Sequence, residues 1–181
     1  MKKILTLLAV VGLIMFSSCE GPEGPPGKDG SKGDPGYINE VFEVKMDFTS
    51  ANNFGKTFSL SPKIYSGDNL LVYLLVNTNN GIDTWALLPQ VYYFPSGTAQ
   101  YNYEFSYDQF SILVDASFPL TQLPSSFTTG KVFRVVIIPG DDGLNTGGPN
   151  SKSSVNKPDY SDYNAVIKKY NIDDSNVKKL N

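Results

Sequence analysis

The sequence predicts an all-β domain, an antiparallel β-sandwich of about eight strands, with a short C-terminal helix after a flexible linker. Three observations predict it. Between residues 37 and 139, short runs alternate apolar and polar residues, as half-buried strands do. Two other runs are apolar at nearly every position, which is typical of central strands covered on both faces. Glycine, proline and asparagine separate these runs and indicate turns.

The first half of this β-sandwich domain is expected to hold four strands. Residues 41–48 and 56–61 alternate with period two, so each should bury one face. Residues 69–76 are continuously apolar and predict a central strand. Asn80-Gly81 is a strong hairpin signal, because both turn positions need a positive φ. The returning strand should end before Pro89.

The second half is expected to hold four more strands. Residues 90–94 form a short strand, and residues 99–107 alternate with unusual regularity. Residues 110–116 alternate again and should pair with the preceding strand through a turn at Asp108-Gln109. Residues 131–138 are the second run that is apolar on both faces.

A linker and a helix follow the sandwich. Residues 140–158 are rich in Asp, Gly, Asn and Ser, which predicts a flexible linker. In the last segment, 159–181, Ser161 is the expected N-cap of a helix and Asn171 its left-handed end. The apolar face that should dock this segment on the sandwich comprises Tyr163, Val166, Ile167 and Tyr170, continued by Ile172, Val177 and Leu180.

Residues 1–18 read as a signal peptide. Lys2 and Lys3 precede an uncharged apolar run from Ile4 to Phe16, which is shorter than the roughly 20 residues of a membrane span. The single cysteine of the chain, Cys19, stands where cleavage is expected. Phe-Ser-Ser-Cys resembles a bacterial lipobox, which implies lipid attachment at Cys19 and a membrane anchor. Acyl chains bind a bilayer at about 0.8 kcal/mol per buried CH₂.

A tether spans residues 19–36. Glycine recurs at every third position from Gly21 to Gly36, with several prolines between, as in collagen. With so few triplets we expect a stiff monomeric spacer, and a homotrimeric stalk is the alternative.

Composition excludes several classes of function. The net charge is −3, and loss of Lys2 and Lys3 with the leader makes it −5. An acidic chain with a single arginine is a poor candidate for nucleic-acid binding. The chain has no histidine, which excludes Ser-His-Asp and Cys-His nucleophiles and histidine-ligated metals. No pattern indicates a cofactor or a catalytic residue, and the expectation is that the protein is not an enzyme.

The candidate ligand-binding residues are aromatic. Tyr101, Tyr103 and Tyr107 share one face of the regular strand, and aromatic faces suit the apolar faces of sugars. Trp85 and Tyr93 are candidates to extend such a surface, as is Tyr92. The interpretation that the pattern favours, however, is that these rings form the core face of an edge hairpin, with the hydroxyl groups reaching its rim.

Charged residues and polar loops give weaker candidates. Arg134 stands among apolar residues and is expected to pair with Glu43, Glu104 or Asp115 rather than with an anionic ligand. Oxygen-rich loops around Asn80 and at Asp141-Asp142 lack the spacing of a calcium loop and read as turns, so no metal site is predicted. The five acidic residues considered for a glycosidase pair, none of them at a telling spacing, are Glu40, Glu43, Glu104, Asp108 and Asp115.

The arrangement as a whole resembles a family of short Bacteroidota lipoproteins with a lipobox, a few Gly-x-y triplets and one β-rich domain. The stretches that carry the resemblance begin at Cys19, Val41, Leu70, Asp83 and Val132, and Trp-Ala-Leu-Leu-Pro is the most specific. The resemblance implies an outer-membrane lipoprotein, facing either the periplasm or the cell surface, with a lipidated Cys19 and nothing catalytic. The expectation is a non-enzymatic binding or structural module with a glycan or protein ligand. The alternatives are an envelope carbohydrate-active enzyme and a trimeric collagen-stalked adhesin.

Overall fold

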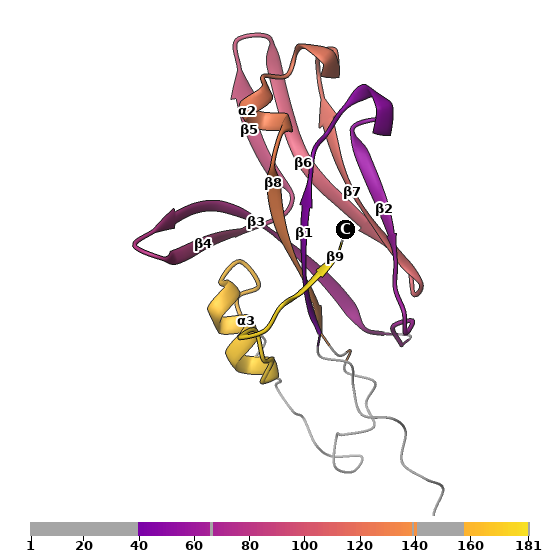
Figure 1. The fold of residues 1–181 in the computed structure, drawn as a ribbon, viewed down its shortest axis with the longest axis vertical. Helices are drawn as coiled ribbons and strands as arrows, with labels where there is room; N and C mark the ends of the chain where they lie inside the picture. Colours follow the sequence, from indigo (N-terminus) through magenta and orange to yellow (C-terminus); the bar gives the residue numbers. More distant parts are fainter. Residues whose placement is uncertain (1–39, 66, 139, 141–157, 181) are drawn as a thin grey trace, which may run out of the picture. The chain divides into compact units, whose positions relative to one another are not determined.

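Two β-sheets packed face to face form the described part of the chain (Figure 1). The structure, a computed structural model, describes residues 40–65, 67–138, 140 and 158–180. The expected signal peptide, tether and nearly all of the linker lie outside the described residues. The strand order is β4-β3-β8-β1-β9 in sheet A and β2-β7-β6-β5 in sheet B. The predicted all-β sandwich with a short C-terminal helix is confirmed.

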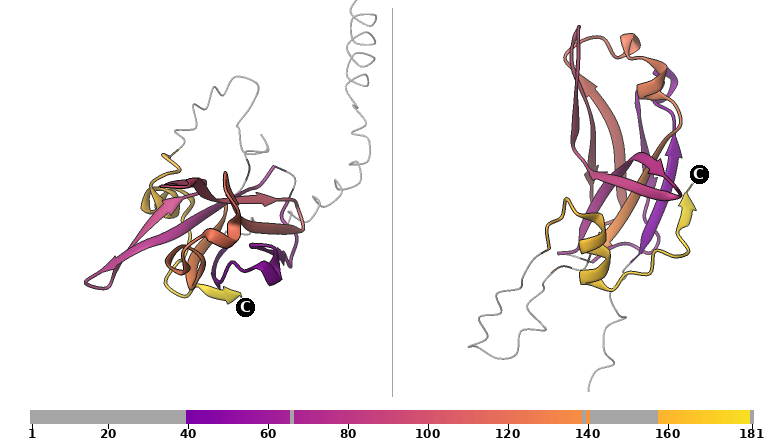
Figure 2. Two further views of the ribbon diagram at one scale, coloured as in Figure 1. Left: turned by 90° about the horizontal axis from the view of Figure 1, so that it is seen from above. Right: turned by 90° about the vertical axis from the view of Figure 1, so that its left-hand side faces the viewer.

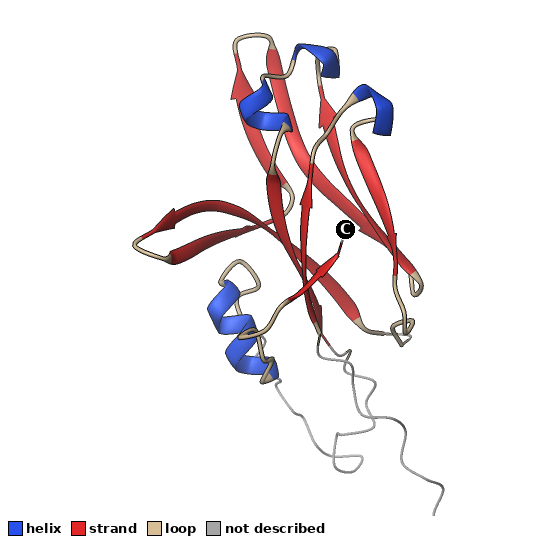
Figure 3. Cartoon of the chain, in the orientation of Figure 1, coloured by secondary structure: helices blue, strands red, loops and turns tan. Residues whose placement is uncertain are grey.

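Strands β1 to β8 and helix α3 lie close to their predicted bounds. The strands are β1 (Val41–Met46), β2 (Gly55–Ser59), β3 (Asn69–Asn79), β4 (Ile82–Leu87), β5 (Gln90–Phe94), β6 (Gly97–Phe105), β7 (Gln109–Ala116), β8 (Lys131–Ile138) and β9 (Lys178–Leu180). The helices are η2 (Ser50–Asn52), η3 (Leu120–Gln122), α2 (Ser125–Thr128) and α3 (Tyr163–Tyr170). Figure 3 shows that the helices are short and lie outside the two sheets.

The two continuously apolar strands, β3 and β8, are neighbours in sheet A, where Val72 lies opposite Val135. Alternate residues of both strands are buried against sheet B, and the residues between them are buried on the other side. Burial on both faces explains why these two strands lack the polar alternation of the others.

The β3–β4 hairpin extends beyond the sandwich (Figures 1 and 2). Its turn is Asn80-Gly81, with φ of 51° and 78°, as the sequence predicts. Val76 and Ile82 are exposed on this projecting part. Strand β3 therefore changes from buried to exposed along its length.

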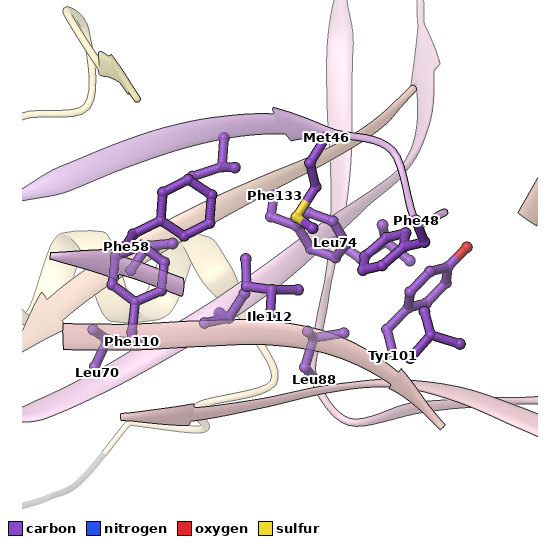
Figure 4. Close-up of a cluster of buried hydrophobic side chains, with 14 of the residues drawn as sticks. Met46, Phe48, Phe58, Leu70, Leu74, Leu88, Tyr101, Phe110, Ile112 and Phe133 are labelled. Carbon is purple, nitrogen blue, oxygen red and sulfur yellow. The ribbon is translucent and has the colours of Figure 1, made fainter. Parts of the chain in front are cut away.

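A hydrophobic core fills the space between the sheets (Figure 4). Phe48, Tyr101 and Phe133 meet there, and each pair of rings has its centroids no more than 6.0 Å apart. Phe58 stacks on Phe110 at 5.0 Å, across the strands β2 and β7. Aromatic pairs at these distances add to the free energy gained by burial.

The C-terminal segment forms a second core on the outer face of sheet A. Tyr163, Val166 and Ile172 are buried there against residues of β1, β3 and β8. Asp162, rather than the predicted Ser161, is the N-cap of α3, and its side chain accepts a hydrogen bond from Ala165 N. Asn171 ends the helix with φ of 50°, as predicted.

After the helix, the chain adds a short strand that the sequence analysis did not predict. Strand β9 pairs in parallel with β1, and Leu180 lies opposite Val44. Leu180 packs against the core between the sheets instead of trailing over the second core. The strand thus covers part of the free edge of β1.

Candidate binding surface

The candidate tyrosine platform does not exist as a single surface. Tyr101 is 1% exposed, and its hydroxyl donates a hydrogen bond to the carbonyl of Phe127. Burial raises the pKa of Tyr101 well above its usual value. Tyr101 is therefore a core residue and not a ligand contact, because its face of β6 is covered by sheet A. The favoured interpretation, in which these rings form the core face of an edge hairpin, is confirmed for Tyr101.

The other members of the proposed platform differ in burial and do not all lie in the same sheet. Tyr103 is half-buried at the margin of the core, and Tyr107 is 58% exposed in the turn between β6 and β7. Trp85 lies on β4, in sheet A, with its ring against Tyr163 at 5.8 Å. The four predicted residues therefore do not converge on one ligand.

Arg134 is held beneath the C-terminal segment. Its guanidinium lies 4.4 Å from the centre of the Trp85 ring, and its Nη1 donates a hydrogen bond to the Tyr163 hydroxyl at 2.9 Å. Nη1 also lies 3.4 Å from Asp174 Oδ2, and Nε lies 3.7 Å from Glu43 Oε2. The predicted pair with Glu43 is confirmed, and Asp174 is a second partner that was not predicted.

This arrangement is suited to holding the segment in place. The Tyr163 hydroxyl donates a hydrogen bond to Asp174 Oδ2 at 2.8 Å while it accepts one from Arg134. Burial, and next the bond to Asp174, raise the pKa of Tyr163 well above its usual value. With two carboxylates and two rings around the cation, Arg134 has little capacity left for an external anion.

The outer face of sheet B carries an uncovered set of polar side chains. The outward-facing residues follow from the strand register, because Tyr92, Ala99, Tyr101, Ile112 and Val114 face the core. They are Gly55, Thr57, Ser59, Val91, Tyr93, Thr98, Gln100, Asn102, Glu104, Gln109, Ser111, Leu113 and Asp115. None of these described positions is Lys or Arg.

The side chains of this face stand in rows across the sheet. Val91, Gln100 and Asp115 lie opposite one another on β5, β6 and β7. In the adjacent row Tyr93 lies opposite Thr98, whose amide donates a hydrogen bond to Ser117 Oγ at 2.9 Å. Directly opposed side chains lie about 5 Å apart at Cβ, so each row can act on one ligand group.

A shallow hollow of about 210 Å³ lies at these rows. Thr98, Gln100, Asp115 and Ser117 supply its polar lining, and Val91 lines it as well. Tyr93, 86% exposed, stands on the edge strand beside Thr98. A hollow with a rigid ring at its side and several hydrogen-bonding groups is chemically suited to a small polar ligand.

The carboxylates of this face are too far apart for paired acid–base chemistry. Asp115 lies opposite Gln100, and Glu104 follows Gln100 by four residues along β6. Four residues of strand span about 13 Å, whereas glycosidase pairs need about 5–9.5 Å. Among the described residues, no cluster of His, Cys, Asp or Glu can hold a metal ion. The described helices include none with the length and apolar character needed to span a membrane.

Comparison with known proteins adds no relative, since no family model, curated protein or solved structure matches the chain.

From the sequence, Tyr93 is expected only as an extension of the platform, and Gln100 is not a candidate. The alternation of residues along β6 could have identified Gln100. If Tyr101 faces the core, then Gln100 and Asn102 must face outward. Cys19, the predicted lipid attachment site, lies outside the described residues.

Proposed function

We propose that this chain is a lipid-anchored, non-enzymatic binding module of the cell envelope, which presents the outer face of sheet B to its ligand. One observation carries the binding part of this proposal, namely the contrast between the two outer faces. The face of sheet A is covered by the chain's own C-terminal segment. The outer face of sheet B has an exposed ring and a polar hollow. No described segment of the chain covers it.

The anchoring part of the proposal rests on Cys19 and the leader that precedes it. In the native host, the full chain should incorporate an alkyne-labelled fatty acid and fractionate with membranes. Cys19→Ser should abolish the label and shift the chain out of the membrane fraction. A Cys19→Ser chain that still fractionates with membranes would contradict the anchor.

The binding part is tested by co-sedimentation with insoluble envelope material purified from the host. The probe protein is the chain without residues 1–19, which keeps the whole compact unit 36–181. Tyr93→Ala should lower the sedimented fraction. Tyr107→Ala, which removes an exposed ring at the β6–β7 turn that contacts Lys63, should leave it unchanged. Equal sedimentation of both variants would show that the outer face of sheet B is not the binding surface.

A further inference from the structure

The outer face of sheet B has the chemistry of a site for uncharged carbohydrate. This inference rests on the proposed function and deepens it by naming the class of ligand. We propose that Tyr93, Thr98, Gln100 and Asp115 form a subsite for one sugar ring of a neutral polysaccharide or oligosaccharide. The hollow that they border or line measures about 210 Å³.

The charges of the face argue against anionic classes of ligand. The outward-facing strand positions carry carboxylates at Glu104 and Asp115 and no Lys or Arg. A nucleic acid or an acidic glycan brings regularly spaced negative charge and needs cations to bind it. An anionic membrane surface needs them as well. A polymer without formal charge avoids this repulsion.

The functional groups fit the two kinds of surface that a sugar ring presents. Hydroxyl groups of a sugar both donate and accept hydrogen bonds, and amide, hydroxyl and carboxylate side chains match them. Gln100 and Asp115 lie directly opposite each other, so both can reach one ring. A carboxylate that accepts from a hydroxyl forms the stronger, charge-assisted bond. The face of the Tyr93 ring supplies apolar area for the C–H groups.

Tyr93 can contact a ligand because its ring is not needed for packing. It is 86% exposed, while the neighbouring Tyr92 packs against the core rings Tyr101 and Phe127. β5 therefore anchors itself through one tyrosine and presents the other outward. Replacing Tyr93 should leave the fold intact, because an exposed substitution typically changes stability by less than about 0.5 kcal/mol.

The test uses an array of purified glycans, neutral and acidic, probed with the chain lacking residues 1–19. We expect binding to neutral glycans that persists between about 0.05 and 0.5 M salt, since no ion pair is involved. Tyr93→Ala should lower affinity about tenfold or more, and Tyr93→Phe, which keeps the ring, should retain most of it. Asp115→Asn should cost about three- to tenfold. Tyr107→Ala is the matched control.

The outcomes separate the ligand class from the function. If no neutral glycan gives a signal that depends on Tyr93, or if acidic glycans bind better, the carbohydrate proposal is wrong. A peptide pairing with the free edge of β5 is the rival occupant, and it would depend on the backbone of Gln90–Phe94 instead of Asp115. If sedimentation with envelope protein alone depended on Tyr93, the proposed binding function would stand and the proposal of a neutral glycan ligand would be wrong.

Discussion

Arg134 shows how one residue can connect two parts of the chain that lie far apart in sequence. Its cation lies on the ring of Trp85 from β4, and it bonds Tyr163 and Asp174 from the C-terminal segment. A planar guanidinium can stack and form several hydrogen bonds at once, which an ammonium cannot. The single arginine of this chain is therefore placed where that geometry is needed.

We expect Arg134→Ala to lower the free energy of unfolding by about 2–3 kcal/mol. This loss is smaller than that for a fully buried pair because Glu43 and Asp174 keep some exposure to water. Arg134→Lys should recover less than half of the loss, since lysine cannot form the same fork. Urea unfolding measures the midpoint, and an unchanged m-value would show that stability alone has changed.

The control for this prediction is Lys45→Ala on β1, an exposed cation that faces the same side of the sheet as Glu43. It should change stability by less than about 0.5 kcal/mol. If the urea midpoint of Arg134→Ala were as high as that of Lys45→Ala, Arg134 would not be the link to the C-terminal segment.

At the scale of elements, the C-terminal segment docks chiefly through the buried face of α3. Val166 is fully buried, while Asn164, two residues earlier, is exposed on the same helix. An eight-residue helix is marginal alone, so its stability must come from this packing. The helix also carries Lys168 and Lys169 in its last turn, where the helix dipole favours cations.

Val166→Ala should therefore destabilise the domain by about 1–2 kcal/mol, from lost burial and the cavity left behind. Asn164→Ala should leave stability unchanged or raise it slightly, because alanine has the higher helix propensity. Hydrogen exchange should show faster exchange in α3 and β9 of the Val166→Ala protein. Equal protection of α3 in both variants would contradict docking through this face.

The elements differ in how far sequence could predict them. Strands β3 and β8 were predictable because apolar runs of this length, bounded by turn residues, are typical of strands covered on both faces. Strand β9 was not, since Lys178 and Lys179 carry no β pattern and its pairing with β1 comes from tertiary contact. The predicted N-cap was wrong by one residue, because Ser161 and Asp162 are both residue types that suit that position.

The candidate binding surface was less predictable than the fold. Alternation shows that Tyr101 and Gln100 face opposite ways, but it does not show which face meets the other sheet. The regular aromatic row therefore leaves a platform open as a second possibility beside the core face that the sequence favours. Only the strand order, with β6 between β5 and β7, places Gln100 in one row with Val91 and Asp115.

At the scale of the whole molecule, buried tyrosines make both cores sensitive to pH. Burial is the main cause that raises the pKa values of Tyr73, Tyr101 and Tyr163. In the unfolded chain these groups lose their protons near the usual value of about 10. Above that pH the unfolded state binds fewer protons than the folded state, so stability falls as pH rises.

We expect the free energy of unfolding to be insensitive to these tyrosines below about pH 9 and to fall above about pH 10. Each of the three should contribute a slope of about 1.4 kcal/mol per pH unit until its native pKa is reached. The ultraviolet absorbance of tyrosinate should therefore show exposed tyrosines ionising first and the buried ones only with unfolding. Tyr101→Phe should reduce by one the number of protons released on unfolding above about pH 10, so the free energy of unfolding should fall less steeply with pH.

The order of ionisation also tests whether the two cores unfold together. Tyr101 lies between the sheets, whereas Tyr73 and Tyr163 meet under the C-terminal segment with ring centroids 5.2 Å apart. If the segment is an integral part of the fold, all three should ionise in one cooperative step that coincides with loss of β-sheet circular dichroism. An early step in which only Tyr73 and Tyr163 ionise, enlarged by Val166→Ala, would instead mean that the segment detaches from an intact sandwich. In that case the outer face of sheet A would become available too, and the contrast between the two faces on which the binding proposal rests would hold only below the pH of detachment.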